Sequence, residues 1–97
     1  MENDSILMAY YKKCKANLDS PIALDMCDTL FVRSEKAGNR RLMAIAKCLK
    51  LDYYYYKNDE ENILKSVKEA KLISRKYNQL KYYYFAWGSR LIIYYLK

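Results

Sequence analysis

The sequence predicts an all-helical fold in which antiparallel helix hairpins stack as an α-solenoid of five helices. The 97 residues include only 2 glycines and 1 proline, too few turn residues for a β-sandwich or barrel. Apolar residues recur at helical spacing in five segments that short polar breaks separate. The chain also resembles itself after a shift of 40 residues, and a two-helix period of this length is typical of helical-repeat proteins. The length fits one domain, residues 1–97.

The first two expected helices form the first hairpin. The first helix covers residues 3–17. Ser20 and Pro21 then indicate a helix start, with serine as the N-cap and proline at the first helical position. Gly38 and Asn39 end this second helix, because glycine readily takes the left-handed conformation that closes a helix.

The third expected helix covers residues 40–57 and includes four consecutive tyrosines, Tyr53–Tyr56. Aromatic runs favour strands, but another helix start follows within two residues and no hairpin signal lies nearby. We therefore expect the tract to be helical. Its four rings would point in all directions, so they must be covered on several sides or offered to a partner.

The fourth expected helix begins with Asn58 as N-cap and with Glu61 placed to complete a capping box. Its apolar face carries Ile63, Val67, Ala70, Ile73 and Tyr77. Its opposite face carries Lys65, Lys68, Lys71 and Arg75, with Leu72 among them. Asn78 ends this helix, and a fifth helix is expected over residues 79–97.

The internal repeat divides the chain into units 1–40 and 41–80 and a half unit 81–97. A gapless shift of 40 residues gives 9 identical pairs in 57. They include Asp19/Asp59, Leu24/Leu64, Ser34/Ser74, Lys36/Lys76 and Leu51/Leu91. Because the chain stops in the middle of this pattern, we expect it to be a piece of a longer protein.

Residues 54–64, followed by Val67 and Ala70, resemble a tetratricopeptide repeat. That family places tyrosine late in its first helix, then a Gly-Asp-like turn, then small and large apolar residues along its second helix. Asn58 and Asp59 stand at the turn. The period of 40 instead of 34 makes this a divergent, long-period member. Such repeats are similar to those that precede signalling modules in bacterial sensor kinases and transcription regulators.

The resemblance implies a concave groove lined by the first helix of each unit. The groove positions implied are Met8, Lys12, Lys15, Cys48, Asp52, Tyr55, Tyr56, Ile92 and Tyr95. Tyrosine suits such an interface because it combines a large ring with a polar tip, and the lysines would attract an acidic protein segment. The alternative is that these side chains pack against the next helix.

The net charge of +7 favours acidic partners, although a lysine-rich surface also serves solubility alone. The function expected is a non-catalytic scaffold or sensor module that binds a protein or peptide segment. The alternative function is nucleic-acid binding, in which tyrosines beside Lys57 and Lys81 stack on unpaired bases while the lysines contact phosphate.

Catalytic and metal-binding residue sets are missing from the sequence. There is no histidine, and Cys14, Cys27 and Cys48 have no CxxC spacing. Asp25 and Asp28 are the one carboxylate pair at helical spacing, which fits a solvated edge better than acid–base chemistry. We therefore expect no enzyme and no cofactor. Buried reduced thiols favour a cytoplasmic location, with a periplasmic sensor region as the alternative if a signal peptide has been removed.

Self-association is expected through the C-terminal helix, residues 80–97. This helix lacks the second half of its unit, so one apolar face would stay uncovered and form a homodimer. The residues on that face are Leu91, Ile92, Tyr94, Tyr95 and Leu96.

Overall fold

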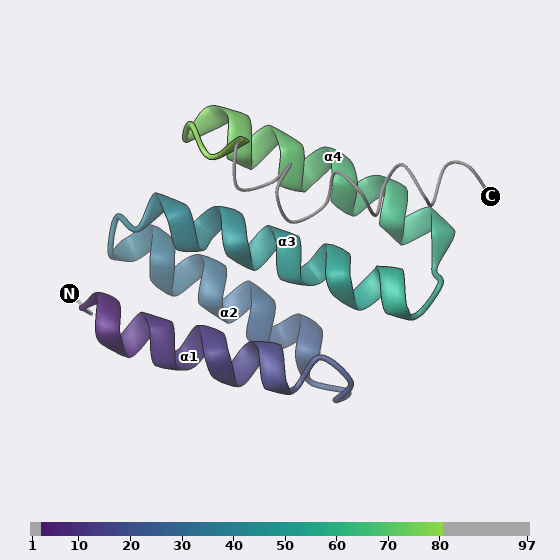
Figure 1. Cartoon of the computed structure of the whole chain (residues 1–97), viewed down its shortest axis with the longest axis horizontal. Coiled ribbons are helices and arrows are strands. Elements are labelled where there is room, and N and C mark those ends of the chain that lie inside the picture. Colours follow the sequence, from purple (N-terminus) through teal and green to yellow (C-terminus); the bar gives the residue numbers. More distant parts are fainter. Residues whose placement is uncertain (1–2, 81–97) are drawn as a thin grey trace.

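The computed structural model describes residues 3–80, which form four α-helices and no strand. The helices are α1 (Asp4–Ala16), α2 (Ala23–Lys36), α3 (Arg40–Tyr56) and α4 (Glu60–Lys76). Successive helices run antiparallel (Figure 1). The all-helical prediction is confirmed for this range, and the tyrosine tract is helical as expected. The expected fifth helix lies outside the described residues from position 81 onward.

Three of the four helices begin with a side-chain cap. Asn3 Oδ1 accepts from the Ile6 amide at 2.9 Å, and Asn39 Oδ1 accepts from the Leu42 amide at 3.0 Å. Helix α4 is capped by Asp59, whose Oδ1 accepts from the amide of Asn62 at 3.3 Å. The prediction of Asn58 as this cap is therefore wrong by one residue.

The turns that end α2, α3 and α4 share one construction. Each contains a residue with positive φ, and these residues are 20 positions apart: Gly38 (71°), Asn58 (57°) and Asn78 (60°). The amide of the following residue donates to a carbonyl five positions back. These bonds are Asn39 to Ser34 at 2.8 Å, Asp59 to Tyr54 at 3.1 Å and Gln79 to Ser74 at 2.6 Å. This is the Schellman closure, which explains why Asn58 ends α3 and does not begin α4.

The connection between α1 and α2 is built differently and is longer, covering residues 17–22. The predicted start of α2 at Ser20 and Pro21 is wrong, because the helix begins at Ala23 and its N-cap, Ile22, makes no side-chain hydrogen bond. Ser20 Oγ instead accepts from the Ile22 amide at 3.3 Å. The serine thus organises the loop ahead of the helix.

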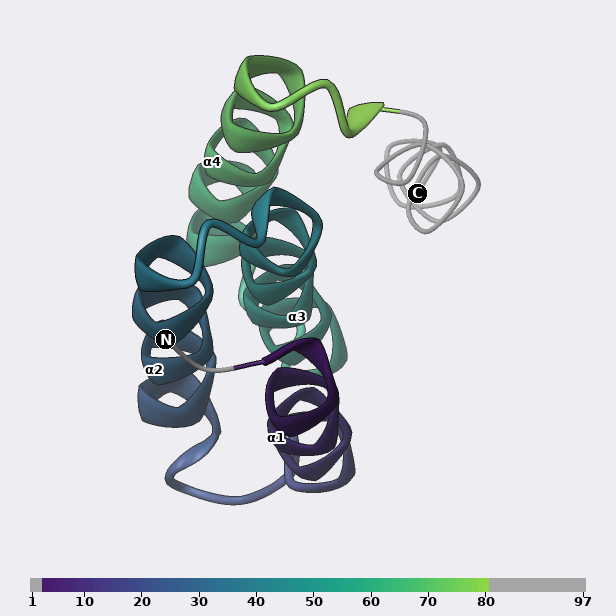
Figure 2. The same cartoon turned by 90° about the vertical axis from the view of Figure 1, so that its left-hand side faces the viewer.

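Helix α3 lies at the centre of the packing. It contacts α2, α4 and α1, and eight of its residues are buried. One core cluster joins α1, α2 and one face of α3: Leu7, Cys14, Met26, Cys27, Leu30, Leu42, Ile45, Ala46 and Leu49. A second cluster joins α3 to α4: Cys48, Leu51, Ile63 and Ala70. Figure 2 shows α2 and α4 on one side of the molecule and α1 and α3 on the other.

Two half-buried lysines of α3 connect it to the helices on either side. Lys50 Nζ lies 3.1 Å from Asp28 Oδ1 on α2. Lys47 Nζ lies 3.6 Å from Glu69 Oε2 on α4 and 4.5 Å from the centre of the Phe31 ring on α2. Burial lowers the pKa of Lys50, but the hydrogen bond and charge of Asp28, together with the charges of Glu69 and Tyr54, outweigh burial and leave that pKa raised. These contacts fix α2 and α4 to α3 through charge as well as through apolar packing.

Candidate functional site

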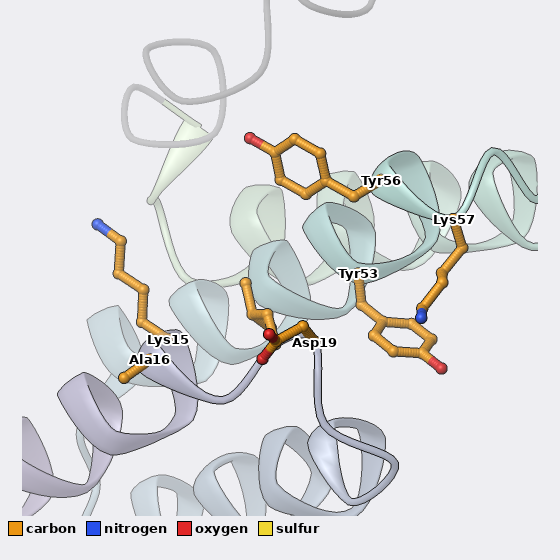
Figure 3. Close-up of a pocket in the computed structure, with 7 residues that line it drawn as sticks. Lys15, Ala16, Asp19, Tyr53, Tyr56 and Lys57 are labelled. Carbon is orange, nitrogen blue, oxygen red and sulfur yellow. The ribbon is translucent and has the colours of Figure 1, made fainter.

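A groove of about 480 Å³ opens where the C-terminal ends of α1 and α3 meet (Figure 3). Helix α1 and the loop after it supply one wall, and the last turn of α3 supplies the other. The lining residues are Lys15, Ala16, Leu18, Asp19, Tyr53, Tyr56 and Lys57. Because α1 and α3 run in the same direction, both of their C-terminal ends come to this edge of the molecule (Figure 1).

The tyrosine tract is divided between the groove and the core. Tyr54 and Tyr55 pack against the second core cluster, whereas Tyr53 and Tyr56 line the groove. Residues three apart on a helix lie on one face, which explains why both tyrosines reach the groove, although their rings point in different directions (Figure 3). Tyr56 is 67% exposed, so much of its ring is accessible to solvent.

Ring contacts hold the groove tyrosines in place. Tyr53 meets Tyr54 edge to face at 5.3 Å, and Tyr55 meets Tyr56 in the same way at 5.6 Å. Lys57 Nζ lies 5.6 Å from the centre of the Tyr53 ring, which is within cation–π range. The exposed Tyr56 ring therefore contacts the half-buried Tyr55, and Tyr53, which is itself half-buried, lies between Tyr54 and Lys57.

Of the sequence-predicted groove residues, Lys15 and Tyr56 line this groove. Met8 and Lys12 are exposed and lie on the same face of α1 as Lys15, at spacings of seven and three residues. Neither of them is among the residues that line the groove.

The other predicted positions are placed differently. Cys48 is 3% exposed within the second core cluster, so burial removes its side chain from the binding surface. Tyr55 covers the same cluster, and Asp52 is half-buried one turn before Tyr56. Ile92 and Tyr95 lie outside the described residues, as do Leu91, Tyr94 and Leu96 of the predicted self-association face.

Sequence reasoning missed Leu18, Asp19, Tyr53 and Lys57 as groove residues. The sequence could have indicated Tyr53, because it stands three positions before Tyr56 and would share its face of the helix. Lys57 follows the same tract directly. Leu18 and Asp19 lie in the α1–α2 loop, and their approach to α3 depends on how the helices pack.

The groove combines an apolar floor with charged edges. Ala16, Leu18 and the two tyrosine rings supply surface for an apolar or aromatic side chain, while Lys15 and Lys57 stand at opposite walls. Asp19 is the single acid among the lining residues described here. Such a site can bury one apolar side chain and attract carboxylates on either side of it.

The thiols are unsuited to nucleophilic chemistry at neutral pH. Burial raises the pKa of both Cys27 and Cys48 to about 12. Burial likewise raises the pKa of Cys14, whose Sγ donates to the Met26 carbonyl at 3.6 Å. Because the thiolate is the reactive form, all three thiols stay protonated and unreactive in the folded chain.

No cluster of three or more His, Cys, Asp or Glu side chains within residues 3–80 could hold a metal ion. None of the four helices has the length and apolarity needed to cross a membrane.

Comparison of the chain with protein-family models, with curated proteins and with solved structures found no significant match.

Proposed function

We propose that this chain is a non-catalytic binding module that holds an acidic segment of another protein in the groove between α1 and α3. The observation that carries the proposal is the meeting of Tyr53, Tyr56, Lys15 and Lys57 from two different hairpins around one hollow. A segment with one apolar or aromatic side chain and flanking carboxylates matches this chemistry.

The proposal includes a repeat architecture. The recurring turn at Gly38, Asn58 and Asn78 supports stacked hairpins of 40 residues, similar to a long-period tetratricopeptide repeat. In such a stack the first helices of the units, here α1 and α3, line one continuous face. The exposed side chains of Met8 and Lys12 would extend the binding surface along that face.

The wider role that we propose is input to a signalling regulator, in which partner binding is passed to a module elsewhere in the same protein. Three free, buried cysteines support a reducing, cytoplasmic setting for this role.

Short synthetic peptides test the groove. One peptide carries a central tryptophan flanked by glutamates, and a second carries the same tryptophan flanked by lysines. We expect the glutamate peptide to bind at least about tenfold more tightly, measured by fluorescence anisotropy. Tyr56→Ala should weaken binding about tenfold, and Lys15→Glu with Lys57→Glu should reverse the preference between the peptides.

The matched control is Lys13→Glu with Arg41→Glu, which makes the same change in net charge at exposed positions outside the groove. It should leave the peptide preference unchanged. Equal affinity for both peptides, or indifference to Tyr56→Ala, would contradict the proposal. Tight binding of oligothymidylate with a steep loss as salt rises would favour the nucleic-acid alternative instead.

A further inference from the structure

The outer faces of α2 and α4 carry opposite charges at equivalent positions. The 40-residue shift that relates the hairpins aligns three acids of α2 with three cations of α4. The pairs are Asp25 with Lys65, Asp28 with Lys68, and Glu35 with Arg75. All six residues are exposed. Asp28 is already paired with Lys50 of α3, so the acids that α2 offers outward are Asp25 and Glu35. The equivalent positions of α4 are basic, although the two helices occupy the same place in their hairpins.

An exposed apolar side chain stands at the centre of each face. Val32 is 44% exposed on α2, and its equivalent on α4, Leu72, is 66% exposed. Leu72 borders a hollow of about 240 Å³ together with Lys68, Lys71 and Arg75. An apolar centre with a charged rim is the usual arrangement of a protein–protein interface.

The two faces look outward from the same side of the molecule. Helices α2 and α4 run in the same direction on either side of α3 (Figures 1 and 2), and they do not pack against each other. The binding groove belongs instead to the ends of α1 and α3. A partner on the α2–α4 side would leave the groove open.

We propose that the occupant of this side is a second copy of the chain, related by a two-fold axis that runs parallel to the helices. Such an axis exchanges the two copies and preserves the direction of their helices. Each α2 then lies beside the α4 of the second copy, in register. Asp25 and Glu35 of one copy face Lys65 and Arg75 of the other, and Val32 meets Leu72.

Charge complementarity favours a second copy over other occupants. A nucleic acid or an anionic lipid surface would be attracted by α4 but repelled by the acidic face of α2 beside it. A second copy satisfies both faces at once, and the symmetry makes every favourable contact twice. The resulting dimer would present two binding grooves, which would strengthen binding to a partner with two acidic segments.

A charge swap tests the pairing by sedimentation at low ionic strength. The first variant, Lys65→Glu with Arg75→Glu, makes both outer faces acidic. The second, Asp25→Lys with Glu35→Lys, makes both faces basic. Each variant alone should be monomeric, with self-association weakened by at least about 100-fold relative to the natural chain. An equimolar mixture should form a heterodimer, because each acidic helix again faces a basic one.

The mixture distinguishes lost pairing from misfolding, because a heterodimer can form only if both variants are folded. The control, Lys13→Glu with Arg41→Glu, changes the charge equally at exposed positions elsewhere and should dimerise like the natural chain. A natural chain that stays monomeric, or one that still dimerises in both swap variants, would overturn the proposal. So would species that keep growing beyond a dimer, because these require an open head-to-tail contact.

Discussion

The two described hairpins are closed in different ways, although the sequence relates them by one repeat. The first hairpin joins α1 to α2 through six residues, 17–22, and α2 starts without a side-chain cap. The second joins α3 to α4 through three residues, with Asn58 at positive φ and Asp59 as a cap. The longer loop brings Leu18 and Asp19 to the groove. The irregular connection of the first hairpin therefore helps to form the groove, whereas the second hairpin is regular.

The two hairpins also differ in core size. Nine buried residues join α1 and α2 to α3, whereas four buried residues among those described join α3 to α4. Leu30→Ala in the larger cluster should lower the free energy of unfolding by about 3–5 kcal/mol, and Ile63→Ala in the smaller one by about 2–3 kcal/mol. Both side chains are 0% exposed. Urea unfolding followed by circular dichroism measures the difference.

Equal losses from the two substitutions would contradict this ranking. They would indicate that the second cluster continues into residues after position 80. Met8→Ala, at a position 39% exposed, is the control and should change the stability by less than about 1 kcal/mol.

The regular parts of the fold could be predicted from sequence because local chemistry fixes them. Gly38 and Asn78 mark helix ends in the sequence and in the structure, and α3 was expected within one residue of its observed end. Ser20 and Asn58 misled for a related reason. Each residue type is a good helix cap, but in the structure the backbone of each residue is hydrogen-bonded within the preceding turn, so the next helix begins later.

The site was only partly predictable, because it depends on neighbours that sequence spacing does not reveal. Lys15 and Tyr56 were expected in the groove from the resemblance to a tetratricopeptide repeat, and both line it. Cys48 was expected there from the same resemblance, yet α3 is covered on two faces and the thiol is buried. The opposed charges of α2 and α4 were present in the 40-residue alignment, but only the arrangement of the helices places both faces on one side.

Ser34 in the first hairpin and Ser74 in the second occupy equivalent, buried positions. Both are 0% exposed, and neither hydroxyl has a hydrogen-bond partner. An unsatisfied buried hydroxyl costs about 1–3 kcal/mol. Ser34→Ala and Ser74→Ala should each raise the free energy of unfolding by about 1 kcal/mol, as measured by thermal unfolding. Ser5→Ala, at an exposed position, should change it by less than about 0.5 kcal/mol. Destabilisation by either core substitution would indicate that the hydroxyl is satisfied in solution.

The smallest expected effect concerns the shared turn. Gly38 has φ of 71°, and a Cβ added there would meet nothing within 4 Å, so the cost of a side chain is conformational alone. Gly38→Ala should lower the free energy of unfolding by about 1 kcal/mol, because alanine disfavours the left-handed region. Gly38→Asn should cost less than about 0.5 kcal/mol, since asparagine tolerates that region and the chain itself uses it at Asn58 and Asn78. Conversely, Asn58→Gly should be neutral or stabilising by a few tenths of a kcal/mol. If Gly38→Asn proved as costly as Gly38→Ala in urea unfolding, the left-handed conformation would not be the source of the loss, and the equivalence of the turns would fail with it.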